Sequence, residues 1–302
     1  MRVSRSGCLV ASLAWMLVGC GPDPGNPPTA SMTSASTSTA RLETTSTTRP
    51  AEPDPSRLIT VDGGNLVALD LATGRGIVLA GHHELAASLG LAEGRFEGVD
   101  LSPDGSVVAF AFGGWEGDHG AHGLYEVPAD GSSSPRRVRL DAGEGYVGRP
   151  HYSPDGRQLA VYSGDRLQVL DEERTTTGEG VQMAYPPHHL TWSPGGDALV
   201  WLGHYGRNQC CTLESVSVDP ATGRMTEEPT AEPTDGSPFF DPVGQLRTMP
   251  PWFTFDVDVS GRFVVASDGT PRLLWWDVTA DEPLPRPLPL DIDLPDAPPI
   301  AW

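Results

Sequence analysis

The sequence contains no lysine, and its charge is strongly acidic. All 20 basic residues are arginines and stand against 40 aspartates and glutamates, so that the formal net charge at pH 7 is −20. A surface of this sign repels nucleic acids and other anionic polymers. The sequence therefore predicts no nucleic-acid partner, and we interpret the excess charge as a well-solvated surface.

Long apolar runs are also missing. An apolar stretch at residues 8–18 follows Arg2 and Arg5 and is too short to span a bilayer, which is typical of a secretory signal peptide. The chain has 35 glycines and 30 prolines among its 302 residues, a composition that favours many turns over long helices.

Cysteine is scarce, with four residues in the chain, and Cys20 directly follows the predicted signal peptide at residues 1–19. The segment Leu17-Val18-Gly19-Cys20 resembles the lipobox of bacterial lipoproteins. The resemblance implies that residues 1–19 are removed and that Cys20 is acylated. The protein is then expected to be extracytoplasmic and lipid-anchored to the bacterial cell membrane, which two or three acyl chains achieve stably. The alternative is an ordinary secretory signal in which Cys20 is incidental.

Residues 20–51 are predicted to be a disordered tether. They are rich in serine, threonine and proline and hold too little apolar surface to fold. A coil of this length has a root-mean-square reach of about 30 Å. The folded domain, predicted at residues 52–302, is therefore expected to stand off the membrane.

One phrase occurs four times in the folded part of the chain. The copies are VDLSPDGSVVAFAF (99–112), HYSPDGRQLAVYS (151–163), TWSPGGDALVWLG (191–203) and DVDVSGRFVVAS (256–267). In Ser-Pro-Asp-Gly, proline presets φ at the second position of a turn and glycine accepts a positive φ at the fourth. The phrases resemble the WD40-like, TolB-type β-propeller repeat, which implies an all-β fold and carries no chemistry of its own.

The two ends of the folded part are predicted to share one blade. Residues 52–70 align with residues 153–171 without a gap. The folded part therefore begins at the turn that would directly follow Trp302 in a complete blade. PPIAW (298–302) is thus expected to supply the inner strand of a blade whose other strands come from 57–80. We predict a five-bladed β-propeller with further blades at about 96–140, 147–184, 187–228 and 252–290. A sixth, degenerate blade within 220–251 is the alternative.

Extra length is concentrated on one predicted face of the propeller. The segments 113–122 and 203–211 read as long loops, and the connections 81–95, with one or two helical turns, and 230–251 fall on the same face. Long loops on a rigid scaffold often bind partners. Unselected drift in loop length is the alternative. We expect histidines to gather there (His82, His83, His119, His122, His188 and His204), and predict a binding face of Trp115, Asp118, His119, His122, His204 and Tyr205.

Two small clusters on this face suggest further chemistry. Asp118, His119 and His122 carry ligand types that hold zinc, although their spacing matches no defined metal motif and a polar loop is the alternative. The adjacent Cys210 and Cys211 are predicted to form a strained vicinal disulfide outside the cytoplasm, with a free or intermolecular pair, or a metal or redox role, as alternatives. No cofactor is indicated.

Polar residues recur two positions before the repeated turn, at Asp100, His151, Thr191 and Asp256. Paired carboxylates near the axis could serve glycoside hydrolysis. Alternation along the inner strand more simply places them between blades as hydrogen-bonded structure. The sequence shows no glycosidase motif and no G-x-S-x-G, so an enzyme is the third-ranked hypothesis.

The family resemblance implies a membrane-anchored, non-catalytic protein-interaction platform with a partner in the cell envelope. The alternative is a sensor of a small ligand or metal on the long-loop face. An interaction platform predicts an exposed apolar patch around Trp115 and Phe239-Phe240. A sensor predicts a polar, histidine-rich pocket at the mouth of the central channel.

Overall fold

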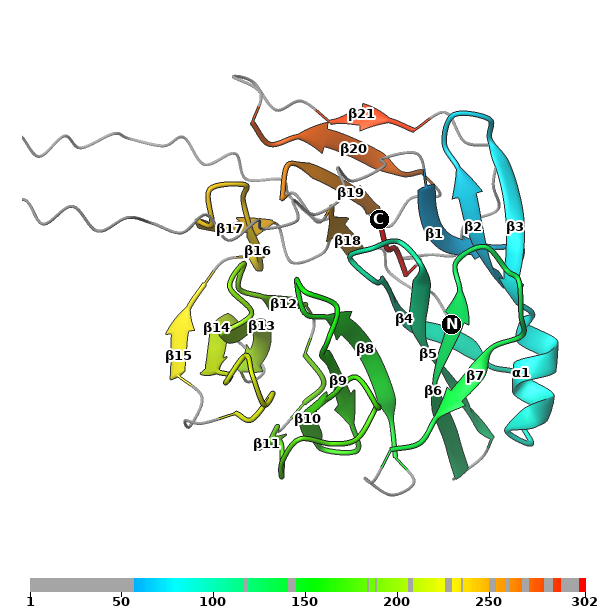
Figure 1. Cartoon of the computed structure of the whole chain (residues 1–302), viewed down its shortest axis with the longest axis horizontal. Coiled ribbons are helices and arrows are strands. Elements are labelled where there is room, and N and C mark those ends of the chain that lie inside the picture. The colour runs from blue at the N-terminus through cyan, green and yellow to red at the C-terminus, as the bar shows by residue number, and fades with distance from the viewer. Residues whose placement is uncertain are drawn as a thin grey trace, which may run out of the picture. The chain divides into compact units, whose positions relative to one another are not determined.

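A computed structural model shows the sheets of the chain arranged around a central axis as a five-bladed β-propeller (Figure 1). The structure describes residues 57–116, 119–140, 145–183, 185–187, 189–205, 209–225, 230–234, 236–249, 254–258, 261–267, 272–279, 285–288 and 299–302. All of these residues belong to one compact unit. The predicted signal peptide, Cys20 and the tether lie outside the described residues.

Each blade is an antiparallel sheet whose strands follow in chain order. The first blade holds β1 (Arg57–Asp62), β2 (Asn65–Asp70) and β3 (Arg75–Ala80), and the second holds β4 (Arg95–Leu101), β5 (Val107–Glu116), β6 (His119–Pro128) and β7 (Arg136–Val138). The third holds β8 (Val147–Tyr152), β9 (Leu159–Ser163), β10 (Arg166–Leu170) and β11 (Val181–Gln182). The fourth holds β12 (Leu190–Trp192), β13 (Ala198–Tyr205), β14 (Gln209–Ser217) and β15 (Thr230–Pro233), and the fifth holds β18 (Thr254–Val257), β19 (Phe263–Ser267), β20 (Leu274–Asp277) and β21 (Arg286–Pro287).

The repeated phrase forms the predicted turn between the first two strands of a blade. Its glycine has a positive φ in all four copies, at Gly105, Gly156, Gly196 and Gly261. The serine hydroxyl accepts a hydrogen bond from the N–H five residues later, at 2.9 Å for Ser102 and Val107, 2.9 Å for Ser153 and Gln158, and 3.0 Å for Ser193 and Ala198. In the fifth blade Asp258 replaces the serine and accepts from Phe263 at 2.6 Å. The side chain at this position therefore fixes the start of the second strand.

The two chain segments close the ring as predicted. Ile59 donates its N–H to the carbonyl of Ala301 at 2.8 Å, and Ala301 donates back at 3.0 Å. Thr60 adds a bond from its hydroxyl to the carbonyl of Pro299 at 3.2 Å. Residues 299–302 thus complete the first blade on its inner side, where an open sheet edge would otherwise remain.

Apolar clusters fill the spaces between neighbouring blades. Fully buried side chains of neighbouring blades belong to the same cluster, as do Ile59 and Phe110, Leu124 and Leu159, Leu167 and Trp201, and Val265 and Leu58. Four of the five spaces between neighbouring blades are filled in this way, and the inner strands read as nearly continuous runs of valine, leucine and aromatic residues.

A two-stranded hairpin lies between the fourth and fifth blades. It consists of β16 (Ser237–Phe240) and β17 (Leu246–Met249). Phe239 is buried in a cluster with Val264 of the fifth blade. The hairpin lies within residues 220–251, the segment considered for a sixth blade. Because it has only two strands, it packs between the fourth and fifth blades and adds no blade. The expectation that Phe239 belongs to an exposed patch was wrong, because this packing covers it.

The two segments predicted as long loops are largely extensions of strands. β5 and β6 stay paired out to Glu116 and His119, and β13 and β14 stay paired out to Tyr205 and Gln209. The glycines and histidines in these segments mask the alternating pattern of a strand. The connection predicted at 230–251 also contains an outer strand, β15. Helix α1 (His82–Ser88) confirms the helical turns expected within 81–95.

Among the described residues, no helix has the length and apolarity that crossing a bilayer requires.

Candidate functional site

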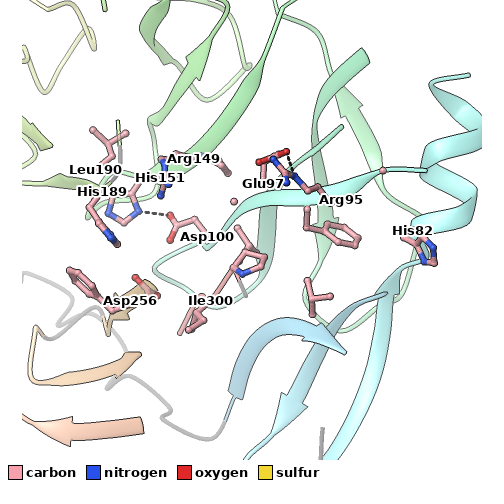
Figure 2. Close-up of a pocket in the computed structure, with 18 of the residues that line it drawn as sticks. His82, Arg95, Glu97, Asp100, Arg149, His151, His189, Leu190, Asp256 and Ile300 are labelled. Atoms are coloured by element: carbon pink, nitrogen blue, oxygen red, sulfur yellow. Dashed lines mark hydrogen bonds and ion pairs between the residues drawn. The ribbon is translucent and has the colours of Figure 1, made fainter. Parts of the chain in front are cut away.

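A cavity of about 590 Å³, lined by both polar and apolar side chains, lies where the inner strands converge. Its lining includes Asp100 of β4, His151 of β8 and Asp256 of β18, three of the four axial polar residues singled out in the sequence (Figure 2). The fourth, Thr191, instead donates a hydrogen bond to the carbonyl of Trp192 at 3.4 Å. The cavity extends to His82 of α1, so the face that carries α1 reaches its lining.

Asp100 links the second blade to the third. Its Oδ2 accepts the N–H of Tyr152 at 2.6 Å and lies 3.2 Å from Nδ1 of His151. Burial lowers the pKa of His151, but the charge and hydrogen bond of Asp100, with the charge of Asp256, outweigh it and leave the pKa raised. His151 therefore favours the protonated form beside the Asp100 carboxylate.

Asp256 makes the equivalent link from the fifth blade to the first. Its Oδ2 accepts the N–H of Trp302 at 2.7 Å. Burial, and then the negative charge of Asp100, raise the pKa of Asp256 to about 7, against the opposing effect of His151. The carboxyl group thus keeps its proton to a much higher pH than an ordinary aspartate does.

Both aspartates accept a hydrogen bond from a backbone N–H of the next blade. The donor is the aromatic residue directly after the axial position, Tyr152 for Asp100 and Trp302 for Asp256. A third link joins the indole Nε1 of Trp192 to the carbonyl of His151 at 3.0 Å. The hydrogen bonds between blades that were expected as the structural role of these residues are therefore present. In chemical terms the axial aspartates hold the ring together, and each uses one oxygen to do so.

Four further polar side chains of the lining were not anticipated, namely Arg95, Glu97, Arg149 and His189. Arg95 and Glu97 form an ion pair of 2.6 Å, and the hydroxyl of Tyr146 donates to Glu97 at 3.3 Å. Burial, together with Glu97, raises the pKa of Tyr146 to about 12. Arg149 lies on the β8 side of the cavity beside His151 (Figure 2). The positions of Glu97 and Arg149 depend on β-bulges in β4 and β8, which interrupt the alternation that sequence reasoning uses.

The predicted binding face is only partly described, and two of its members lie together. Trp115 is exposed over 65% of its surface, whereas His122 on the neighbouring strand is buried. The ring of His122 packs edge-on against Trp115 at 5.7 Å and Tyr146 at 5.1 Å between centroids. Burial, the largest influence, lowers the pKa of His122. His122 therefore supports Trp115 from below and is not part of the accessible surface.

The other predicted site residues fall partly outside the described structure. His82 lines the central cavity, and His83 contacts it with ring centroids 3.7 Å apart. Asp118 and His188 lie outside the described residues. The side chains of His119 in β6, of His204 and Tyr205 in β13, and of Cys210 and Cys211 in β14 also lie outside, so the vicinal disulfide stays a prediction.

No group of three histidine, cysteine, aspartate or glutamate side chains suited to a metal occurs among the residues whose side chains are described. Because Asp118 and the His119 side chain lie outside that set, the metal site of Asp118, His119 and His122 also stays a prediction. The burial of His122 argues against its taking part without rearrangement of the hairpin.

No protein-family profile and no curated protein sequence matches the chain. Solved structures with a similar arrangement include Kuenenia stuttgartiensis hydrazine synthase, with 15% identity, a TM-score of 0.50 and 74% of each chain covered. They also include TolB from Acinetobacter baumannii, with 18% identity, a TM-score of 0.43 and coverage of 83% of this chain and 55% of that one. A putative TolB from Agrobacterium tumefaciens has 18% identity, a TM-score of 0.44 and coverage of 77% and 87%. At these identities the similarity concerns the fold alone.

Proposed function

We propose that the protein is a membrane-anchored, extracytoplasmic and non-catalytic platform that binds another protein of the cell envelope through the face carrying Trp115. The observation that carries the proposal is the exposure of Trp115, at 65%, on a hairpin whose strands remain paired to their ends. Exposed tryptophans that are held in place are among the side chains that contribute most to binding a protein partner.

Trp115 is fixed by its neighbours although most of its surface faces solvent. Gly120 is its cross-strand partner, and a Cβ atom at Gly120 would lie 2.8 Å from the indole carbon Cε3. The indole therefore lies over the backbone of Gly120, with the edge of His122 against it. A side chain held in this way loses little rotamer freedom when a partner covers it, which favours binding.

The axial residues support the non-catalytic part of the proposal. Asp100 and Asp256 are the carboxylates that a glycosidase-like mechanism would require. One oxygen of each accepts a hydrogen bond from a backbone N–H of the next blade. The location rests on the lipobox-like segment that ends at Cys20 and on the Ser/Thr-rich tether that follows it. Repulsion by the acidic surface argues against anionic polymers as partners.

Crosslinking in intact cells tests the proposal. A photoreactive amino acid replaces Trp115 in the full-length protein, and a second strain carries it at Tyr185, an aromatic residue that is exposed to a similar extent, at 57%. Illumination is followed by purification and mass spectrometry. We expect position 115 to capture one envelope protein that position 185 does not capture. Identical products from the two positions, or none above background, would refute the proposed contact.

A further inference from the structure

We propose that the central cavity binds a small organic acid that also carries hydroxyl groups, and that the guanidinium of Arg149 holds its carboxylate. This site is separate from the partner contact proposed for Trp115 and does not depend on it. The inference rests on the charges that face the cavity, on the backbone at Arg149 and on the other groups of the lining.

The acidic groups of the cavity already have partners. Glu97 pairs with Arg95 and accepts from Tyr146, and Asp100 accepts from Tyr152 and faces His151. Asp256 accepts from the N–H of Trp302. Two of the three acidic groups thus face a basic side chain of the protein, Arg95 or His151, which leaves less negative charge for a cationic ligand.

Arg149 is the exception among the charged groups of the lining. Its charge acts on Glu97 and Tyr146, but among the described residues no side chain or carbonyl accepts a hydrogen bond from its guanidinium. An arginine keeps its charge even when burial disfavours it, as burial does for Arg149. A partly buried cation without a bonded acceptor is costly, and an entering carboxylate would satisfy it through two parallel hydrogen bonds.

The backbone conformation of Arg149 also supports its role in binding. Arg149 has a φ of 53° and precedes Pro150, a combination that non-glycine residues rarely adopt. It lies in the bulge of β8 between Gly148 and His151, and Gly98 of β4 leaves room for it, since a Cβ at Gly98 would lie 2.9 Å from the Arg149 nitrogen. Strained residues of this kind concentrate at binding sites.

The comparison with Arg174 makes the strain at Arg149 informative. Arg174 is the other described non-glycine residue with a positive φ, at 63°. Its guanidinium pairs with the buried Glu126 at 2.7 Å, so its unusual conformation serves a contact within the protein. Arg149 has no such internal acceptor in the described structure, and its conformation turns the side chain to the cavity (Figure 2).

The remaining lining fits the rest of a hydroxy acid. The ring of His189 stacks on Phe255, with centroids 4.6 Å apart and an angle of 17° between the planes, and forms a flat wall. Asp256 also lines the cavity and can accept a hydrogen bond from a hydroxyl group of the ligand. The volume of about 590 Å³ lies within the range of small-molecule sites.

Calorimetry with the purified full-length chain tests the assignment. The probes are sodium glucuronate, malate and citrate, with glucose as the neutral analogue of glucuronate and inorganic phosphate as a second anion. The test variant is Arg149→Asn, because asparagine tolerates a positive φ and removes the charge. The control variant is Arg157→Asn, at an exposed turn of the same blade, and thermal melting checks that both variants fold.

We expect one of the three acids to bind saturably at millimolar concentration or below, with no binding of glucose. Arg149→Asn should weaken that binding by about tenfold or more, and Arg157→Asn should leave it unchanged. Equal binding of glucuronate and glucose, unchanged affinity in Arg149→Asn, or no binding of any acid would overturn the assignment. Binding of phosphate alone would overturn the assignment to an organic acid. None of these results bears on crosslinking at position 115, so the two proposals fail separately.

Discussion

The carboxylate of Asp256 accepts a hydrogen bond from the backbone N–H of Trp302, with 2.7 Å between Oδ2 and the nitrogen. Trp302 directly follows Ala301, which pairs with Ile59. The bond therefore joins the fifth blade to the first at the point where the ring closes. Asp100 and Tyr152 repeat the contact at 2.6 Å between the second and third blades.

Asp256 predicts a pH dependence of stability with a definite sign. Its pKa of about 7 in the folded protein exceeds the ordinary value of 3.8, so the fold favours the protonated acid. The resulting stabilisation is complete below about pH 4 and is lost as the pH rises through about 7. The amide that the Asp256→Asn substitution introduces stays neutral, and its oxygen can still accept the N–H of Trp302.

We therefore expect the free energy of unfolding of Asp256→Asn to increase relative to that of the wild type as the pH rises from about 4 to about 8. Urea denaturation of both proteins across this range measures the difference. A difference that stays constant with pH would show that Asp256 titrates normally in the fold.

Substitution of Glu126 is expected to cause a large loss of stability. The buried carboxylate accepts from the hydroxyl of Tyr152 at 3.0 Å, from Arg174 at 2.7 Å and from Arg136 at 2.7 Å, and so ties the second blade to the third. Glu126→Gln turns a donor toward these donors and removes the charge that they share. The free energy of unfolding should fall by about 3 kcal/mol.

The matched control is Glu172→Gln. Glu172 is 61% exposed and pairs with Arg157 at 3.3 Å. Because exposed pairs contribute little, its loss should change stability by less than about 0.5 kcal/mol. Equal effects of the two substitutions in urea denaturation would contradict the structural role of Glu126.

Substitution of Gly120 is expected to change the position of the Trp115 ring and little else. A methyl group at position 120 would overlap the indole, whose Cε3 and Cζ3 would both lie 2.8 Å from it. Gly120→Ala should displace the exposed ring, shift its indole N–H resonance and change stability by at most about 1 kcal/mol. Assignment through Trp115→Phe identifies the resonance. Gly178→Ala, which meets no atom within 4 Å, should leave it in place. An unshifted resonance in Gly120→Ala would show that Trp115 is not seated on Gly120.

Cys20 predicts the attachment to the membrane. Cys20→Ser removes the thiol that the lipobox-like segment presents for acylation. We expect the variant to lose incorporation of an alkyne-labelled fatty acid and to leave the membrane fraction. Cys8→Ser, inside the segment that is predicted to be removed, should behave as the wild type does. Retention of the label in Cys20→Ser would place the acyl group elsewhere or exclude it.

The architecture could be predicted because the repeat is local. Each turn has a glycine and a side-chain acceptor in fixed positions, and three of the four also have a proline. The acceptors are Ser102, Ser153, Ser193 and Asp258. The ends could be paired because residues 52–70 repeat 153–171. The extended hairpin at 113–122 could not, since glycine and histidine carry little information on burial, and Gly120 is explained only by the indole opposite it.

The cavity was predicted in part for the same reason. Asp100, His151 and Asp256 hold equivalent places in the repeat, so their positions near the axis follow from the phrase itself. Arg149 and Glu97 reach the cavity through bulges that shift the register by a residue, and such shifts leave no regular pattern. Whether Arg149 has an acceptor within the protein depends on atoms from two blades and cannot be read along one strand.

Oxidative footprinting in intact cells tests the proposed partner face most directly. Hydroxyl radicals modify exposed aromatic side chains, and Trp115 and Tyr185 are 65% and 57% exposed in the isolated protein. If a partner covers the face, Trp115 should be several times less oxidised in cells than in the purified protein, while Tyr185 reacts alike in both. Equal oxidation of Trp115 in cells and in solution would contradict a platform that binds its partner through this residue.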